Sequence, residues 1–137
     1  MAYIFRQKLN LNELAVLESP SKKILLAEPE EYLLQLYSRY LDLHNFEVHH
    51  CQDPLLLQNA LPKYNPHLLI LNIDASSARA TLRSVRSSWP HLPIVTIGYN
   101  VEPATLRNLM TMGISSHIDR RMTRPQDLVI IAQTILQ

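Results

Sequence analysis

The stretch "PHLLILNIDASS", Pro66–Ser77, has the pattern of a buried strand that ends in a polar loop. Its centre, from His67 to Leu71, is mostly large and apolar, which is typical of strands covered on both faces of a parallel sheet. Asn72 follows where the apolar run ends, and Asp74 comes two residues later. Ligand sites in open α/β sheets form beyond the carboxyl ends of the strands. We therefore expect Asn72 and its neighbours to lie at a site.

Similar short apolar runs stand on both sides of this stretch, and a helical pattern follows each run. The expected strands cover residues 22–28, 46–51, 67–72, 93–98 and 115–119. The expected helices cover residues 30–46, 54–64, 76–89, 102–113 and 124–137. Connections of a few residues between parallel strands require right-handed crossover helices. The pattern therefore predicts an α/β fold with a doubly wound, five-stranded parallel sheet, in (βα)5 order.

Local signals support several of these helix boundaries. Asp53 followed by Pro54 predicts a helix cap with proline in the first helical position. Asn45 and Gly113 are expected to end helices. In the first helix, the spacing places these residues on one apolar face: Leu33, Leu36, Tyr37, Tyr40 and Leu41.

Length and composition bound the class of protein. The 137 residues suit one domain, in which residues 1–21 stand apart as an N-terminal extension or arm and residues 22–137 form the regular part. The formal net charge of +1 does not point to nucleic acid or to an anionic membrane. The single cysteine excludes an internal disulfide, and no apolar run reaches the roughly 20 residues that cross a bilayer. We expect a cytoplasmic protein that neither spans nor binds a membrane.

Residues 22–137 resemble the receiver domain of bacterial response regulators, a CheY-like, flavodoxin-like fold. The resemblance rests on "KKILLAEPEEYLLQLYSRYL", "NFEVHHCQDPLLLQNAL", "NPHLLILNID", "LPIVTIG" and "LMTMGISSHIDRR" in this order and spacing. It implies signal transduction in a two-component system or phosphorelay. Receivers hold Mg²⁺ with two acids after the first strand and phosphorylate an aspartate after the third. A Ser or Thr after the fourth strand and a Lys after the fifth complete their site.

Three of these positions carry acids in receivers, and this chain keeps the first and departs from the other two. Glu28 matches the first Mg²⁺-binding acid, but Pro29 stands at the second and offers no ligand atom. Glu30, one residue further, starts from the beginning of the helix. Asn72 stands at the phosphoacceptor position, and a carboxamide cannot form the acyl phosphate.

The two remaining positions also depart. Gly98 stands where a hydroxyl would bond the phosphoryl group. Counting from Gly113 places Arg120 at the lysine position, whereas counting back from the last helix places Arg121 there. We expect this arginine to reach Glu28 or Asn72 and close the former pocket.

These departures agree with one another and predict a pseudo-receiver that keeps the fold without the phosphoryl chemistry. On this interpretation the chain is not an enzyme, holds no metal or other cofactor, and acts as a protein–protein interaction module. The alternative is an atypical receiver that a divalent metal, a phosphoryl group or a small ligand switches in the altered pocket. An unrelated small enzyme ranks last, because no nucleophile–base pair follows the strands.

The resemblance also implies an interaction face on the fourth helix, the fifth strand and the last helix. Its expected members are Met110, Met112, His117, Arg121 and Met122. Methionines suit adaptable interfaces, and the arginines at 120, 121 and 124 are expected to give the face a basic rim. The expected occupants are a protein partner or a second copy in a homodimer, so any effect on transcription passes through another protein.

Three further patterns have less specific interpretations. Arg79, Arg83 and Arg86 fall on one helix face, which suits a solvated surface, an acidic partner or a phosphate backbone. His49 and His50 face opposite sides of their strand and cannot share one metal. Asp74 is a second candidate for the phosphoacceptor, but we expect it to be a loop acid near the start of the next helix that points away from the site.

Overall fold

The expected five-stranded parallel sheet forms the centre of the molecule. The computed structural model describes residues 21–137, so nearly all of the predicted N-terminal extension lies outside the described residues. The strands are β1 (Lys23–Ala27), β2 (Glu47–Cys51), β3 (Leu68–Asn72), β4 (Ile94–Gly98) and β5 (Ser116–Asp119). They are all parallel in the order β2-β1-β3-β4-β5, and β3 is buried along its whole length.

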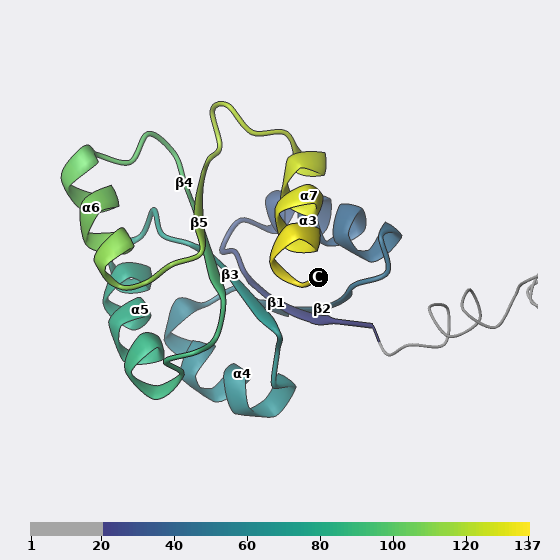
Figure 1. Ribbon diagram of the computed structural model, residues 1–137, viewed down its shortest axis with the longest axis horizontal. Coiled ribbons are helices and arrows are strands. Elements are labelled where there is room, and N and C mark those ends of the chain that lie inside the picture. The colour runs from purple at the N-terminus through teal and green to yellow at the C-terminus, as the bar shows by residue number, and fades with distance from the viewer. Residues whose placement is uncertain (1–20) are drawn as a thin grey trace, which may run out of the picture.

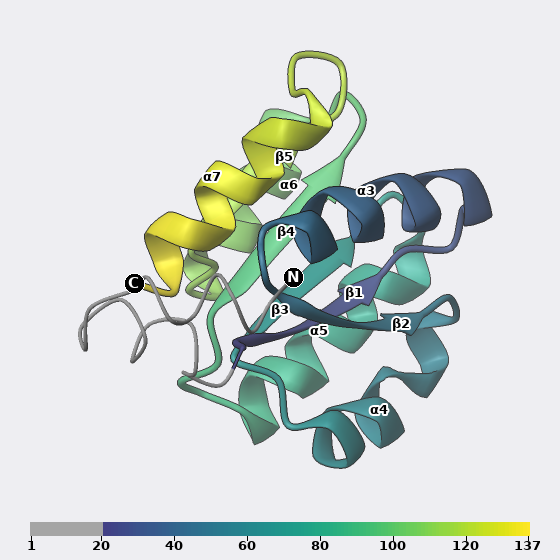
Figure 2. The same ribbon diagram turned by 90° about the vertical axis from the view of Figure 1, so that its right-hand side faces the viewer.

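Helices cover both faces of this sheet (Figures 1 and 2). The helices are α3 (Glu31–Leu43), α4 (Leu57–Tyr64), α5 (Ser76–Ser88), α6 (Pro103–Thr111) and α7 (Pro125–Ile135), with a 3₁₀ turn, η1 (Pro54–Leu56), before α4. Residues of α3 and α7 join one apolar cluster with the sheet. Residues of α4, α5 and α6 join a second cluster on the other face. The doubly wound architecture is therefore confirmed.

The predicted helix signals act as expected at three places. The Asp53 carboxylate accepts a hydrogen bond from the Leu55 amide at 2.9 Å and caps η1, which leads into α4. Asn45 follows α3 with a φ of 68°, and Gly113 follows α6 with a φ of 73°. Both residues take the left-handed backbone conformation that ends helices, which asparagine tolerates and glycine adopts at no steric cost.

The buried face of α3 differs from the prediction. Leu34, Tyr37 and Leu41 form its buried line, whereas Leu36 is only partly buried. Leu33 and Tyr40 flank that line and pack against the same cluster. The apolar face is wider than expected because α3 contacts both β1 and α7.

None of the helices in residues 21–137 combines the length and apolarity that a bilayer crossing requires.

Candidate functional site

The strand register brings the predicted pocket residues together at one edge of the sheet. Ala27 pairs with Leu71, so the next residues, Glu28 and Asn72, stand side by side. Gly98 pairs with Asp119 at the ends of β4 and β5. Glu28 and Asn72 are two of the few buried polar residues in the described interior. Because a buried polar group is costly unless it is hydrogen-bonded, their partners decide what the site can do.

Both carboxylate oxygens of Glu28 are occupied. Its Oε1 accepts a hydrogen bond from Asn72 Nδ2 at 2.8 Å, and its Oε2 accepts one from the Glu30 amide at 3.0 Å. Burial raises the pKa of the Glu28 carboxyl, and these two hydrogen bonds oppose that rise. Asn72 therefore stabilises the buried carboxylate of Glu28.

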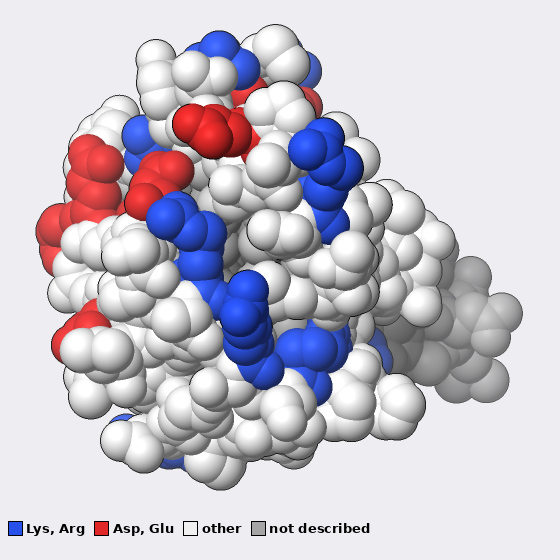
Figure 3. Space-filling model, turned by 90° about the vertical axis from the view of Figure 1, so that its left-hand side faces the viewer, with Lys and Arg blue, Asp and Glu red and all other residues white. Residues whose placement is uncertain are grey.

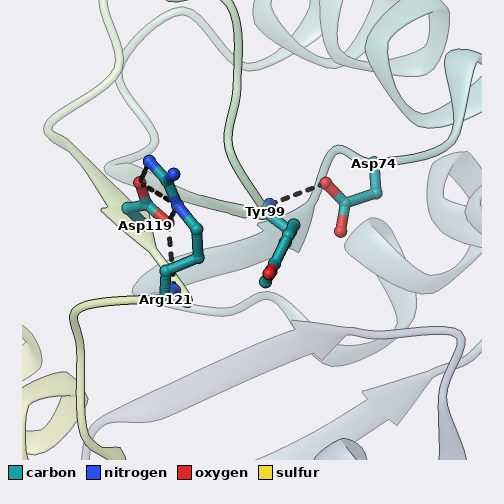
Figure 4. A network of polar contacts seen from close by, with 4 residues as sticks. All are labelled: Asp74, Tyr99, Asp119 and Arg121. Carbon is teal, nitrogen blue, oxygen red and sulfur yellow. Dashed lines mark hydrogen bonds and ion pairs between the residues drawn. The ribbon is translucent and has the colours of Figure 1, made fainter.

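The other side of the Asn72 carboxamide organises the following loop. Asn72 Oδ1 accepts a hydrogen bond from the Asp74 amide at 2.9 Å. Asp74 Oδ1 in turn accepts one from the Tyr99 amide at 2.8 Å, so the loop after β3 is tied to the end of β4 (Figure 4). The expectation that Asp74 points away from the site was wrong. Its carboxylate is a structural acceptor.

Gly98 leaves no unused space where receivers place a hydroxyl. A Cβ atom built on Gly98 would lie 2.5 Å from Val101 Cγ2, 3.2 Å from Ile73 Cδ1 and 3.3 Å from Asp74 Oδ1. The first distance is shorter than side-chain contacts allow, and valine is stiff at χ1. The loop after β4 thus closes over the position, and a serine there requires Val101 to move.

The two arginines after β5 have different partners. Arg120 donates its amide to the Gly98 carbonyl at 3.0 Å, and its guanidinium lies 3.7 Å from a Glu30 carboxylate oxygen. Arg120 is therefore the arginine that lies nearer to Glu28 and Glu30. Its ion pair joins Glu30, which corrects the expected contact with Glu28 or Asn72.

Arg121 turns away from the pocket to its neighbour. Its guanidinium and amide bind the Asp119 carboxylate at 2.7–3.2 Å (Figure 4). These hydrogen bonds hold the pKa of Asp119 well below its ordinary range. Both arginines also lie over the Tyr99 ring, with centroid distances of 5.7 Å for Arg120 and 6.0 Å for Arg121.

The pocket residues do not fit the Mg²⁺ site that the fold implies. Mg²⁺ needs free oxygen ligands, usually from one or two carboxylates. Glu28 uses both oxygens in hydrogen bonds, Pro29 supplies no ligand atom, and Glu30 is paired with Arg120. Within residues 21–137, no three His, Cys, Asp or Glu side chains gather into a possible metal site. His49 stacks on Tyr64 and His50 bonds Ser38, on opposite sides of β2 as predicted.

The residues of the expected interaction face do not all share one surface. Met110 and Met122 are largely exposed. Met112 instead packs against the cluster under α4, α5 and α6 and lines a groove between α5 and α6. His117 is partly buried, and its Nδ1 lies 2.8 Å from the hydroxyl of the fully buried Thr96. Burial lowers the pKa of the His117 imidazole, while Asp119 and Asp74 oppose that shift.

The predicted basic rim is neutralised. Arg120 pairs with Glu30, Arg121 with Asp119, and Arg124 with Asp127 at 3.4 Å. Each arginine thus lies beside an acid, so the rim carries little net charge.

Sequence reasoning missed two residues that hold the architecture. Arg86 donates hydrogen bonds to five backbone carbonyls, at Trp89, Pro90, Leu92, Met112 and Gly113. Thr96 supplies the buried partner of His117. A threonine in the middle of the apolar run "PIVTIG" was the one available signal for Thr96. Helical spacing placed Arg86 on a helix face but did not indicate its hydrogen bonds to backbone carbonyls.

Comparison with known proteins finds the same fold at low sequence identity. No family model and no curated protein sequence matches the chain. Among solved structures, a response regulator from Thermotoga maritima matches with a TM-score of 0.75 and 13% identity, over 85% of this chain and 98% of that one. The chemotaxis protein CheY4 of Vibrio cholerae matches with a TM-score of 0.76 and 17% identity, over 84% and 98%.

An orphan response regulator of H. pylori matches with a TM-score of 0.78 and 14% identity, over 86% of this chain and 98% of that one. At such identities the likeness shows the fold, which is that of response regulator receiver domains. The predicted CheY-like, flavodoxin-like architecture is confirmed.

Proposed function

We propose that this chain, which has the fold of response regulator receiver domains, is a pseudo-receiver in bacterial signal transduction. It acts in the setting of two-component systems and phosphorelays, in the cytoplasm, without accepting a phosphoryl group. Its work is to contact other proteins. It catalyses no reaction and uses no cofactor.

The hydrogen bond from Asn72 Nδ2 to Glu28 Oε1, 2.8 Å long, carries the proposal. A carboxamide nitrogen that donates this bond has its lone pair delocalised into the carbonyl and cannot attack phosphorus. The same bond occupies the carboxylate oxygen that a metal would need. Asn72 therefore supplies no nucleophile, and its hydrogen bond competes with a metal for Glu28 Oε1.

The surroundings of this contact support the same function. Gly98 has no hydroxyl and is overlaid by Val101, and the Arg120 guanidinium is paired with Glu30. Electrostatic stabilisation of a phosphoryl group needs donors aimed at the transferring oxygens. Here no hydroxyl is present at residue 98, and the Arg120 guanidinium is paired with Glu30.

The proposed contact surface is the α6–β5–α7 face, which we define by Met110, His117, Arg121, Met122 and Ile130. Met112 is left out because it lines the groove between α5 and α6. Met110, Met122 and Ile130 are 59%, 79% and 58% exposed, so they offer apolar area to a partner. Because the rim arginines are paired with acids, the face suits a partner with an apolar, uncharged surface.

A titration followed by ¹H–¹⁵N NMR tests the proposal. Mg²⁺ is added first and beryllofluoride, which mimics a phosphoryl group, second. We expect the amide resonances of Glu28, Asn72 and Gly98 to stay in place. Saturable shifts at these residues that spread to α6 would establish the alternative, a receiver switched by metal, phosphoryl group or ligand in its altered pocket.

The double variant Pro29→Asp/Asn72→Asp provides the matched control. It restores the second acid and the phosphoacceptor while leaving Gly98 and Arg120 unchanged. We expect Mg²⁺ to shift the resonances around residue 28 in this variant. If Mg²⁺ shifts the resonances of the double variant and not those of the natural chain, Pro29 and Asn72 are the reason that the natural chain does not respond.

A second copy of the chain is one partner that the α6–β5–α7 face can take, because the neutral rim does not repel itself. Sedimentation equilibrium tests this homodimer. A mass that rises with concentration and returns to that of the monomer in Met122→Glu would support it. A monomer at every concentration would leave a different protein as the occupant.

A further inference from the structure

A groove between α5 and α6 shares no residue with the α6–β5–α7 face. It encloses about 510 Å³. Its walls carry Arg79, Arg83, Ser84, Thr105 and Asn108, and its apolar residues are Ala80, Leu109 and Met112. The lining thus combines hydrogen-bonding groups and positive charge with an apolar floor.

The two helices that form this groove carry only positive charges, and acids approach it at one end, where Asp74 and Glu102 line a neighbouring pocket with Arg79. Helix α5 contains Arg79, Arg83 and Arg86, helix α6 contains Arg107, and neither helix contains an acid. The whole chain has a formal net charge of only +1. Figure 3 shows Lys and Arg side chains gathered along this side of the molecule. Such a segregated field attracts an anionic partner even when the net charge is small.

Two of these arginines fix the shape of the groove. Arg86 ties the end of α5 to the turn after α6 through the carbonyls of Met112 and Gly113, at 2.9 and 3.1 Å. Arg79 holds the start of α5 through the carbonyl of Ile73, at 3.0 Å. The groove is therefore formed before any partner arrives, and a partner does not have to order it.

Arg83 is positioned for binding. It lies between Arg79 and Arg86 on α5 and is exposed. Within residues 21–137 its guanidinium makes no hydrogen bond and no ion pair, unlike Arg79 and Arg86. A guanidinium presents several donors in a planar fork that matches a carboxylate, so Arg83 can take an acidic side chain of a partner.

We infer that this groove binds an acidic peptide segment of a protein partner, with an apolar side chain of the segment seated on Leu109 and Met112. The apolar floor favours a peptide over nucleic acid, since no aromatic side chain lines the groove for base stacking. The inference does not rest on the proposed function, because the groove shares no residue with the Glu28–Asn72 pocket.

Selection from a random peptide library displayed on phage, against the full chain, tests the inference. We expect the enriched peptides to combine several Asp or Glu residues with Leu, Met or Phe. A synthetic copy of the tightest peptide should shift amide resonances of α5 and α6 in NMR. Its affinity should fall as NaCl rises, because salt screens exposed charges.

Two groove variants and one matched control locate the binding. Arg83→Glu and Ala80→Glu each place an acid in the groove, and we expect each to weaken peptide binding by at least about tenfold. Arg39→Glu reverses an exposed helical arginine on α3, across the sheet, and should leave the affinity unchanged. Thermal unfolding followed by circular dichroism confirms that the three variants are folded.

Three results would overturn the inference. The first is a selection that enriches no peptides, or peptides without acidic residues. The second is an acidic peptide whose affinity both groove variants leave unchanged. The third is a single-stranded oligonucleotide that binds the groove more tightly than any selected peptide, which would make nucleic acid the occupant. The Mg²⁺ and beryllofluoride titration is unaffected by any of these outcomes.

Discussion

Asn72 carries an NH₂ group where aspartate has a carboxylate oxygen. The hydrogen-bond partners of Asn72 make this replacement important for stability. With Asn72→Asp, a second carboxylate would face Glu28 in a buried place, and the donor to Glu28 Oε1 would be lost. Two like charges without a cation repel, and a buried acceptor without a donor is costly. We expect Asn72→Asp to lower the free energy of unfolding by about 2–4 kcal/mol, measured by urea denaturation at pH 7.5 with EDTA.

The matched control for this substitution is Asn59→Asp, an exposed asparagine on α4. It should change the free energy of unfolding by no more than about 0.5 kcal/mol. Because Pro29 supplies no ligand, Mg²⁺ should recover little of the stability lost in Asn72→Asp. Equal stability of Asn72→Asp and the natural chain would contradict the role assigned to the carboxamide.

Glu28 predicts a particular dependence of stability on pH. Burial raises its pKa above the ordinary 4.5, so the folded chain keeps this proton to a higher pH than the unfolded chain. Between 4.5 and the raised pKa the folded state binds more protons. The contribution of Glu28 to stability therefore falls as pH rises through this window and is constant above it.

Glu28→Gln isolates this contribution from that of other acids. The pKa values of Asp119 and Asp127 are lowered, so the stability that these two groups contribute to the fold is lost as the pH falls. Subtracting the urea stability curve of Glu28→Gln from that of the natural chain removes their effect. The difference should decline as pH rises from about 4.5, and a difference that rises with pH would show a lowered pKa instead.

At the scale of elements, Arg86 joins the end of α5 to the turn that follows it and to the distant turn after α6. Its five carbonyl acceptors come from the turn after α5 and from the turn after α6. Burial lowers the pKa of this guanidinium, as expected for a cation taken partly out of water. Arg86→Met leaves these carbonyls without their donor, and we expect a loss of about 2–4 kcal/mol in the free energy of unfolding.

Two comparisons test this role by chemical denaturation. Arg86→Lys keeps the charge, but a single ammonium group cannot span acceptors spread over two turns, so it should recover less than half of the loss. Arg83→Met, three residues earlier on the same helix, should stay within about 0.5 kcal/mol of the natural chain. A similar loss for Arg83→Met and Arg86→Met would remove the distinction between the two arginines.

The helices and strands could be predicted from the sequence because the apolar periodicity agrees with the positions of the residues that end each element. Apolar runs placed β1, β3 and β4, and Asp53 placed the start of η1, whereas the more polar β2 and β5 were placed by their positions between helical patterns. The face of α3 was less predictable. Leu34 was missed because helical spacing alone does not reveal that α7 lies beside α3.

The candidate site was predictable where strand neighbours determine it. Once β1 and β3 are adjacent, Glu28 and Asn72 must meet. Contacts made by loops were not predictable: the Asp74–Tyr99 bond, the packing of Val101 on Gly98 and the pairing of Arg120 with Glu30 depend on backbone paths that no periodicity describes. The hydrogen bonds of Arg86 could not be predicted either, because their acceptors are backbone carbonyls, which every residue has.

At the scale of the molecule, one sheet carries two apolar clusters. Ile24 and Leu26 of β1 belong to one cluster, and Leu25 and Ala27 belong to the other. The central strand β3 alternates between the two clusters in the same way. Disrupting β1 or β3 would therefore weaken both clusters, which favours unfolding in a single cooperative step.

This arrangement predicts that residues 22–137 fold without the preceding segment. The buried apolar residues of the described region run from Ile24 to Ala132, so the fragment retains both clusters. We expect its free energy of unfolding to lie within about 0.5 kcal/mol of that of the full chain, with one urea transition.

A fragment of residues 28–137 is the control, because it lacks β1 and with it the pairing to β2 and β3. This control should not fold, since three fully buried side chains, Ile24, Leu25 and Leu26, are lost from the two clusters. An unfolded or aggregated 22–137 fragment would instead make residues 1–21 part of the folding unit, and the boundary at residue 22 would be wrong.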